Sequence, residues 1–277
     1  MVWLTALLIG LVQGICRFLP VSASGHMSVI VNLFGLNYIR ENNMLFEALM
    51  HLAAFGAIMT IYGRDFAAII RDTIEYAKTP IRDKNTEKLP LNVRTASMVG
   101  IGIAPILIPL FMQKAFKALY LKTGFVALGL VITGVLLWAA CQVSEGKRSV
   151  KSMSVATAAL TGVANAISAL PGMSLFASAY CMSVTNEFKQ TNAVRFAYMI
   201  MAPIYLLAGI IEALVSLNSG MDFSYIWMYL AGAAVTYVSS YAAILFFRYI
   251  LERKKLINVA LYLFGIGSIA LILSIFM

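Results

Sequence analysis

Long stretches without a charged residue alternate with short basic segments along this chain. Four such stretches reach the roughly 20 apolar residues that a helix needs to cross a bilayer, and two more contain or closely follow a single charged residue. The six predicted spans are residues 48–62, 95–113, 123–144, 196–217, 223–247 and 256–277. The pattern therefore predicts an all-α polytopic membrane protein with about six transmembrane helices.

The composition supports this class and excludes others. Hydrophobic residues make up 61% of the chain and charged residues 12%, and the mean hydropathy is +0.86. Soluble domains carry roughly 45–50% apolar and about 25% charged residues. Disordered, collagen-like and coiled-coil proteins are excluded, and three cysteines are too few for a secreted disulfide scaffold. The net charge of +9 comes from short loops between apolar stretches, which indicates contacts with anionic lipid heads and no nucleic-acid partner.

Two further apolar stretches, residues 1–35 and 152–186, are interrupted in the middle. The first contains Arg17 and Pro20, the second contains Pro171, and small polar residues follow each proline. Irregular backbone at mid-membrane depth is tolerated only where it is buried in protein or lines a cavity. We therefore predict that each stretch forms a re-entrant helical hairpin.

The two interrupted stretches resemble each other. Gly10 and Gln13 precede a Leu-Pro pair in the first, and Gly162 and Asn165 precede such a pair in the second. Paired, broken hydrophobic segments in two halves of a chain point to a transporter-like site near the membrane midplane. We expect a single membrane domain, 1–277, built from inverted repeats at approximately 1–144 and 152–277.

The basic residues predict the orientation. Residues 64–94, 145–151, 187–195 and 248–255 together hold 16 of the 21 Lys and Arg residues, which favours a cytoplasmic location for these four segments. Residues 64–94 then form a cytoplasmic loop, expected to be a short surface helix plus loop. Both termini lie outside, and the two hairpins enter the membrane from opposite sides. The N-terminus lacks a basic segment, so no cleaved signal peptide is expected.

Three segments resemble the signatures of a known family. Residues 10–26 read G-L-V-Q-G-I-C-R-F-L-P-V-S-A-S-G-H, which is similar to G-x-x-E-G-x-x-E-F-L-P-[VI]-S-S-[TS]-G-H of the undecaprenyl-pyrophosphate phosphatases, the bacitracin-resistance family. Residues 46–52 are similar to the family's F-E-x-x-I-[HQ]-L-G, and residues 171–174 to the start of its P-G-x-S-R-S-G. The order, spacing and hydropathy profile also match, so the chain is identified as a divergent member.

The resemblance implies a fold and a function. The family's fold is six spans plus two interdigitating re-entrant hairpins. Its activity is the hydrolysis of a polyprenyl pyrophosphate carrier lipid at the bacterial plasma membrane, which recycles the lipid for peptidoglycan synthesis and confers bacitracin resistance. The family resemblance also allows for a divalent cation such as Mg²⁺ or Ca²⁺.

Several motif positions carry other residues in this chain. Gln13 and Arg17 stand where the first motif has glutamates, and Ala23 stands where it has the serine taken as the nucleophile. In the segment that begins at Pro171, Leu175 stands at the arginine position of P-G-x-S-R-S-G, and Phe176 stands at the serine position that follows. Pyrophosphate hydrolysis needs a nucleophile and cationic groups that neutralise the phosphates, and an amide beside an arginine is a poor ligand set for a hard cation. We therefore expect weak or no hydrolysis, no metal site and no other cofactor.

The residues that remain predict a phosphate-binding site. A charge within the membrane costs at least roughly 2.5–3.5 kcal/mol and marks a functional site by default, so Arg17 is expected to hold a lipid phosphate. The alternatives are an ion pair with Glu47 or extension of Arg17 toward water. Ser174 follows Pro171-Gly172 at the start of a half-helix, where free backbone N–H groups favour anions. The predicted phosphate-binding residues are Arg17, Ser22, Ser24, His26, Gly172 and Ser174.

Other residues have supporting or optional roles. Ser24 and His26 are the candidate catalytic residues if hydrolysis occurs, although His26 has an alternative role as a hydrogen-bonded core histidine. Gln13, Glu47 and His51 are expected to support the site without contacting the phosphate.

Three kinds of function remain open. The first is hydrolysis of a polyprenyl pyrophosphate, and the alternative is non-catalytic binding or flipping of a polyprenyl phosphate or another anionic lipid. The broken helices and Arg17 favour the alternative. A regulatory or scaffold protein would leave Arg17 and His26 unexplained. The sequence does not determine the oligomeric state.

Overall fold

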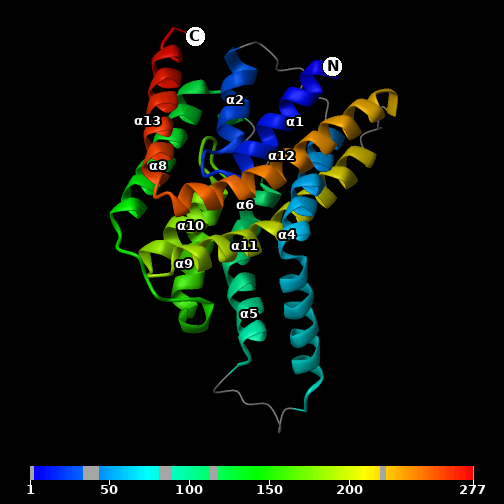
Figure 1. Ribbon diagram of the computed structural model, residues 1–277. Coiled ribbons are helices and arrows are strands. Elements are labelled where there is room, and N and C mark those ends of the chain that lie inside the picture. The colour runs from blue at the N-terminus through cyan, green and yellow to red at the C-terminus, as the bar shows by residue number, and fades with distance from the viewer. Residues whose placement is uncertain (1–2, 34–43, 81–88, 113–117, 219–222, 277) are drawn as a thin grey trace.

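The computed structural model describes residues 3–33, 44–80, 89–112, 118–218 and 223–276, and nearly all of them are helical (Figure 1). The α-helices are α1 (Trp3–Phe18), α2 (Ala23–Leu33), α4 (Met44–Lys78), α5 (Leu91–Ile103), α6 (Leu107–Phe111), α8 (Thr123–Gln142), α9 (Val155–Ile167), α10 (Leu175–Thr185), α11 (Gln190–Asn218), α12 (Ile226–Glu252) and α13 (Leu256–Leu273). Short 3₁₀ turns lie at Ala104–Ile106, Val150–Ser152 and Phe223–Tyr225.

Among the described residues, six helices are long and apolar enough to cross a membrane, which confirms the predicted class. They are α4, α8, α11, α12, α13 and the segment Leu91–Pro109, in which a 3₁₀ turn with Pro105 joins α5 to α6. In contrast, α1, α9 and α10 have 16, 13 and 11 residues, so they are shorter than the roughly 20 residues of a complete span. The two apolar stretches interrupted at Pro20 and Pro171 are therefore divided into short helices, whereas α11 continues through Pro203.

The two divided stretches form the helix pairs α1–α2 and α9–α10, and each break has a local cause. Pro20 follows α1, which ends at Phe18, and Ser22 has a φ of 67°, a left-handed conformation directly before α2. In the other pair, Gly172 directly follows Pro171 and has the left-handed conformation, with a φ of 83°. A serine hydroxyl then starts the next helix in each case, because Ser22 accepts from the N–H of Gly25 and Ser174 accepts from that of Ala177.

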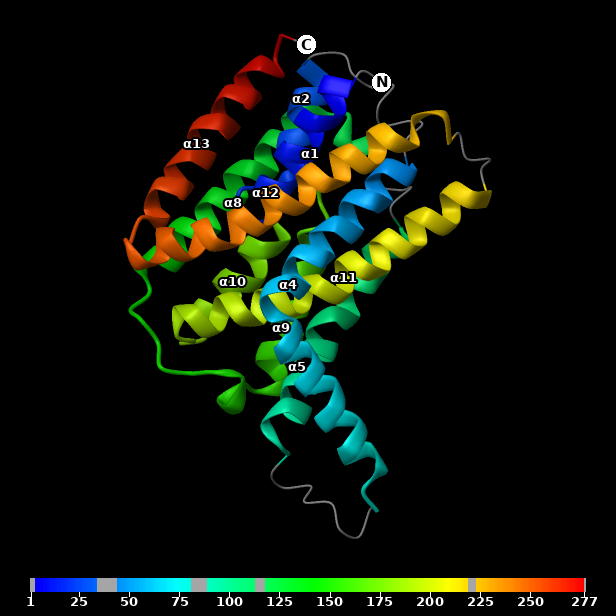
Figure 2. The same ribbon diagram turned by 45° about the vertical axis from the view of Figure 1, so that its right-hand side comes forward.

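The two turns meet inside the protein. The pair α1–α2 lies at the end of the bundle where both termini lie, and α9–α10 lies toward the opposite end (Figures 1 and 2). The Ser22 hydroxyl donates to the carbonyl oxygen of Met173 at 3.0 Å, and a Cβ added to Gly25 would lie 3.0 Å from the Cα of Gly172. The turns that contain Pro20 and Pro171 are thus in contact. Entry from opposite membrane faces and the inverted repeat stay predictions that this contact favours.

Long helices hold the pairs in place. α1 packs along α12, α11 along α4, and α13 along α8. The α1–α12 contact is close because small residues face each other, as in many membrane helix pairs. A Cβ on Gly10 would overlap the carbonyl oxygen of Gly232, and the Thr236 hydroxyl donates to the Gly10 carbonyl oxygen at 3.1 Å.

Residues 64–94 contain the expected helix, but this helix is a continuation of α4. Instead of a separate surface helix, α4 continues without a break to Lys78, and α5 begins at Leu91 (Figure 2). No glycine or proline occurs between Arg64 and Thr79, so nothing ends the helix where the charged residues begin. Asn92 donates to Asp72 at 2.7 Å, which joins the two helix extensions. Residues 81–88 of this segment lie outside the described residues, and its cytoplasmic location stays a prediction.

Candidate functional site

The first turn places three predicted residues together. The Ser22 hydroxyl lies 3.3 Å from that of Ser24, and it contacts both the N–H of Gly25 and the carbonyl oxygen of Met173. Ser22 is 2% exposed, whereas Ser24 is half-buried. The hydroxyl of Ser22 is therefore used to hold the turn, and Ser24 has the more accessible hydroxyl.

His26 is held through both nitrogens of its ring. Nδ1 lies 2.9 Å from the carbonyl oxygen of Ser22, and Nε2 lies 2.7 Å from the hydroxyl of Tyr262, whose ring stacks on the imidazole. A carbonyl oxygen only accepts, so Nδ1 carries the proton and, in the neutral ring, Nε2 accepts from Tyr262. His26 thus has the hydrogen bonds of the alternative core role, and neither nitrogen contacts Ser24 in this arrangement.

The second turn uses its polar groups internally. The hydroxyl of Thr133 on α8 donates to the Gly172 carbonyl oxygen at 3.3 Å and accepts from the N–H of Ser174 at 3.3 Å. The Ser174 hydroxyl caps α10 and is 4% exposed. Gly172 and Ser174 lie beside Ser22, as the prediction of a shared site requires, but the contacts of Ser174 are structural.

Arg17 lies in a separate group of contacts. It is the buried end of α1, 8% exposed, so its side chain does not extend toward water. Its Nε donates to the Gln13 side-chain oxygen at 3.2 Å, and its guanidinium carbon lies 5.2 Å from the centre of the Tyr205 ring on α11. A cation over an aromatic face is stabilised by the ring's charge distribution.

The same group continues from Tyr205 to an internal hydrogen-bonded pair of ionisable side chains. The His51 ring on α4 lies 5.8 Å from that of Tyr205, and His51 Nδ1 lies 2.7 Å from Oε2 of Glu212 on α11. The Glu212 side chain is 5% exposed and that of His51 is 17% exposed. Glu47 lies one turn before His51 in the first turn of α4. Helices α1, α4 and α11 therefore bring together three ionisable side chains that are distant in sequence, and the Arg17–Glu47 pairing remains an untested alternative.

The predicted phosphate site is thus divided into two groups. The first, which we call the turn group, contains Ser22, Ser24, His26, Gly172 and Ser174. The second, which we call the charge group, contains Gln13, Arg17, His51 and Glu212 with Tyr205 and Glu47. Each group contains residues of the α1–α2 pair: Arg17 lies near the end of α1, and Ser22 lies five residues later in the turn before α2.

Phe176, which stands at the last serine position of the signature P-G-x-S-R-S-G, is part of a packed aromatic core. Phe176 is 0% exposed, stacks on Tyr198 with 4.8 Å between ring centres, and meets Phe247 edge-on at 4.8 Å. Tyr198 in turn donates to the carbonyl oxygen of Phe18, the last residue of α1. Large apolar side chains therefore occupy the space beside α10 in which the resemblance places reactive residues.

The residues present do not fit a divalent cation. The two positions that hold carboxylates in the resembling motif carry Gln13 and Arg17, and the Gln13 oxygen accepts a hydrogen bond from the guanidinium. A hard cation needs several free oxygen ligands, and a neighbouring guanidinium repels it. Among the described residues, no group of three or more His, Cys, Asp and Glu side chains has the geometry to hold a metal ion.

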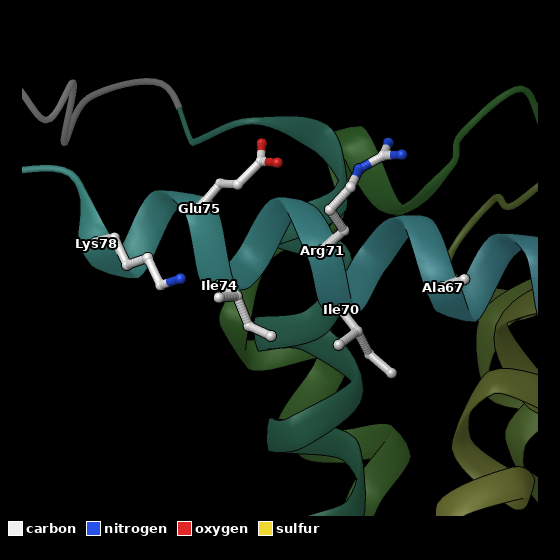
Figure 3. A pocket seen from close by; sticks show the side chains of 6 residues that line it. All are labelled: Ala67, Ile70, Arg71, Ile74, Glu75 and Lys78. Carbon is white, nitrogen blue, oxygen red and sulfur yellow. The ribbon is translucent and has the colours of Figure 1, made fainter.

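A surface hollow lies far from both groups, on the exposed extension of α4. Ala67, Ile70 and Ile74 line it together with Arg71, Glu75 and Lys78 (Figure 3). None of the residues predicted for the phosphate site contributes to it.

Six apolar helices and two broken helix pairs whose turns meet inside the bundle define a polytopic membrane protein with an internal polar site. A family model described as "Bacitracin resistance protein BacA" matches residues 6–269, and the chain belongs to this family. The predicted family is thereby confirmed, and its description includes bacitracin resistance.

Relatives of known name cover almost the whole chain. The chain is 28% identical over 272 residues to the undecaprenyl-diphosphatase of Alkaliphilus metalliredigens, with 98% of each chain covered. It is 30% identical over 275 residues to undecaprenyl-diphosphatase 1 of Shouchella clausii, covering 97% of this chain and 95% of the relative. Identity to the undecaprenyl-diphosphatase of Halothermothrix orenii is 27% over 268 residues, with 96% of each covered.

Sequence reasoning missed two residues of the charge group, Tyr205 and Glu212, and two residues that contact the turn group, Thr133 and Tyr262. One of them had a signal, because Glu212 is the single charged residue in the apolar stretch 196–217. The two tyrosines and the threonine are ordinary residues in apolar helices, and nothing in their local sequence distinguishes them.

Proposed function

We propose that this protein binds the phosphate head group of a polyprenyl phosphate or pyrophosphate carrier lipid and hydrolyses it weakly or not at all. It acts in the bacterial plasma membrane with both termini outside. The names of its relatives support the lipid class, and the turn and charge groups supply the polar side chains for a phosphate. Arg17 neutralises phosphate charge, and the half-buried hydroxyl of Ser24 contacts the head group.

The main support for weak or absent hydrolysis is the packing around the replaced positions. Ala23 has no nucleophilic atom, Phe176 is fully enclosed by other aromatic rings, and both nitrogens of His26 are engaged. Removing a single electrostatic stabiliser typically lowers kcat by roughly 10²–10³-fold, and several such groups are replaced here.

The test is phosphate release by purified protein from undecaprenyl pyrophosphate in detergent, with and without Mg²⁺ or Ca²⁺. We expect release near the background rate under each condition, while the lipid still binds. The Shouchella clausii relative, prepared in the same way, serves as the control for an intact assay. Robust turnover that Ser24→Ala or His26→Ala abolishes would instead support hydrolysis with Ser24 as a displaced nucleophile.

A second candidate function is movement of the lipid phosphate across the bilayer. It is favoured by the two broken helix pairs, which approach from opposite ends of the bundle and meet at Ser22 and Met173. Protein-dependent transfer of a fluorescent polyprenyl phosphate between the leaflets of proteoliposomes tests this candidate. No transfer above that of protein-free liposomes would exclude it.

A further inference from the structure

The charge group contains a pair that phosphate binding alone does not explain. His51 and Glu212 lie on different helices, α4 and α11, and approach to 2.7 Å inside the bundle. Ionisable side chains within membrane helices are expensive and occur in proton relays and substrate pathways. Arg17 by itself is enough to attract an anion, so the pair requires a separate explanation.

The hydrogen bond determines where a proton can bind. An ionised Glu212 only accepts, so His51 donates to it through Nδ1–H, and the neutral ring then has its free electron pair on Nε2. The His51 side chain is 17% exposed, compared with 5% for Glu212, so His51 is the more accessible member. A proton that adds to Nε2 leaves the Nδ1–H bond to Glu212 in place.

The surrounding charges favour joint binding of a proton and an anion. Arg17 on α1 and His51 both lie against the Tyr205 ring, Glu212 on α11 lies 2.7 Å from His51, and Glu47 lies one turn away on α4. With both glutamates ionised and His51 neutral, these four side chains carry one net negative charge, which opposes a phosphate. One proton on His51 makes the group neutral, so each ligand strengthens binding of the other.

Two other helices that pack on α4, α12 and α5, each have an arginine whose contacts lie away from His51. Arg248 of α12 donates to Tyr62, which is eleven residues, or about 16 Å, along α4 from His51. Arg94 of α5 donates to the carbonyl oxygen of Met153. Tyr229 of α12, a neutral phenol, stacks on Phe46 near the start of α4.

We propose that His51, held by Glu212, is a proton-binding site within the membrane that is coupled to anion binding at Arg17, so that binding of a lipid phosphate takes up a proton. The coupling to the lipid rests on the proposed function, whereas the proton site itself does not. The proton comes from water and adds to Nε2, and no covalent bond between heavy atoms changes. The class of reaction is proton-linked binding of an anionic lipid.

The first test counts protons. Binding of farnesyl phosphate to the detergent-solubilised protein is measured by calorimetry at one pH in two buffers of different ionisation enthalpy, which gives the protons taken up per lipid. We expect uptake in the unmodified protein and its loss in His51→Gln, with farnesyl phosphate bound at least about fivefold more weakly. Glutamine occurs at this position of the family signature, so this variant is expected to fold. Glu212→Gln, which keeps the shape of the side chain, should also reduce the uptake.

The control is Asp65→Asn, which removes a carboxylate that pairs with Arg195 at 2.9 Å on the exposed part of α4. Proton uptake should be unchanged in this variant. If His51→Gln binds the lipid with the same proton uptake as the unmodified protein, the coupling is refuted while the proposed lipid binding stands. Absence of lipid binding to the unmodified protein would instead refute the proposed function.

A second measurement addresses the proton site without a lipid. The chain has two histidines, so isotope labelling of histidine gives two imidazole NMR signals, and the signal lost in His51→Gln is that of His51. We expect this ring to gain a proton reversibly between pH 9 and 5, with a larger protonated fraction at fixed pH once farnesyl phosphate is bound. A ring that stays neutral over the whole range would overturn the proton site. An equal fraction with and without bound lipid would overturn its coupling.

Discussion

The hydroxyl of Ser22 donates a hydrogen bond to the carbonyl oxygen of Met173, which lies 151 residues later in the chain. The Ser22 hydroxyl oxygen also accepts from the N–H of Gly25 and thereby starts α2. One side chain therefore closes the turn of the first helix pair and joins it to the turn of the second. The turn group exists as a unit because of this contact.

Replacing Ser22 should test that unit. Ser22→Ala removes a helix cap and leaves a buried carbonyl oxygen without its partner, so we expect a loss of about 2–4 kcal/mol of stability. Ser22→Gly should lose less, because glycine adopts the observed φ of 67° without strain. Thermal unfolding in detergent measures both. Ser24→Ala, which changes a half-buried hydroxyl, is the control, and a Ser22→Ala protein as stable as this control would contradict the role of the contact.

Contact between α8 and the second turn should depend on the absence of a side chain at Gly129. A Cβ at this position would overlap the carbonyl oxygen of Pro171, so Gly129→Ala should displace the turn and lower the thermal stability. Gly265 on α13 has no atom within 4 Å of an added Cβ. Gly265→Ala should therefore leave the stability unchanged or raise it by up to about 1 kcal/mol through better helix propensity. Equal effects of the two substitutions would show that the close approach is unimportant.

Arg17 should be the residue on which lipid affinity depends most. Charge-assisted hydrogen bonds contribute roughly 1.5–3 kcal/mol, so Arg17→Gln should weaken binding of a polyprenyl phosphate by about 10- to 150-fold in a folded protein. If the partner of Arg17 is Glu47 instead, Arg17→Gln and Glu47→Gln should both lower the thermal stability by comparable amounts. Lipid binding and thermal unfolding of the two variants distinguish these cases. Unchanged lipid affinity in a stable Arg17→Gln protein would exclude Arg17 as the phosphate ligand.

Phe176 should be structural. Its ring is completely buried between Tyr198 and Phe247, so Phe176→Ala should cost about 3–5 kcal/mol of stability. Phe125, which is 42% exposed on α8, is the matched control, and Phe125→Ala should cost much less. A Phe176→Ala protein with unchanged thermal unfolding would contradict the packing argument for the lost reactive position.

The charge-free stretches and the prolines were sufficient to predict the architecture. A membrane span needs a length of apolar chain, which is visible in a short window of sequence. A proline alone does not decide a break, because α11 continues through Pro203, and the two broken segments were distinguished by the small polar residues after Pro20 and Pro171. The extension of α4 to Lys78 was missed because charge was interpreted as the end of a helix. Charged residues end a membrane span, but they do not end the helix itself.

The amino-acid sequence by itself determined the membrane class, the family, the two broken segments and the replacement of the reactive residues. Only the tertiary structure decided which polar side chains meet: His26 with Tyr262, Arg17 with Tyr205, and His51 with Glu212. His51 and Glu212 are 161 positions apart and lie on two long helices, each of which contacts several neighbouring helices. Their meeting depends on how α4 packs against α11 and how far each helix is rotated. Those quantities result from the packing of the whole bundle, so no local pattern records them.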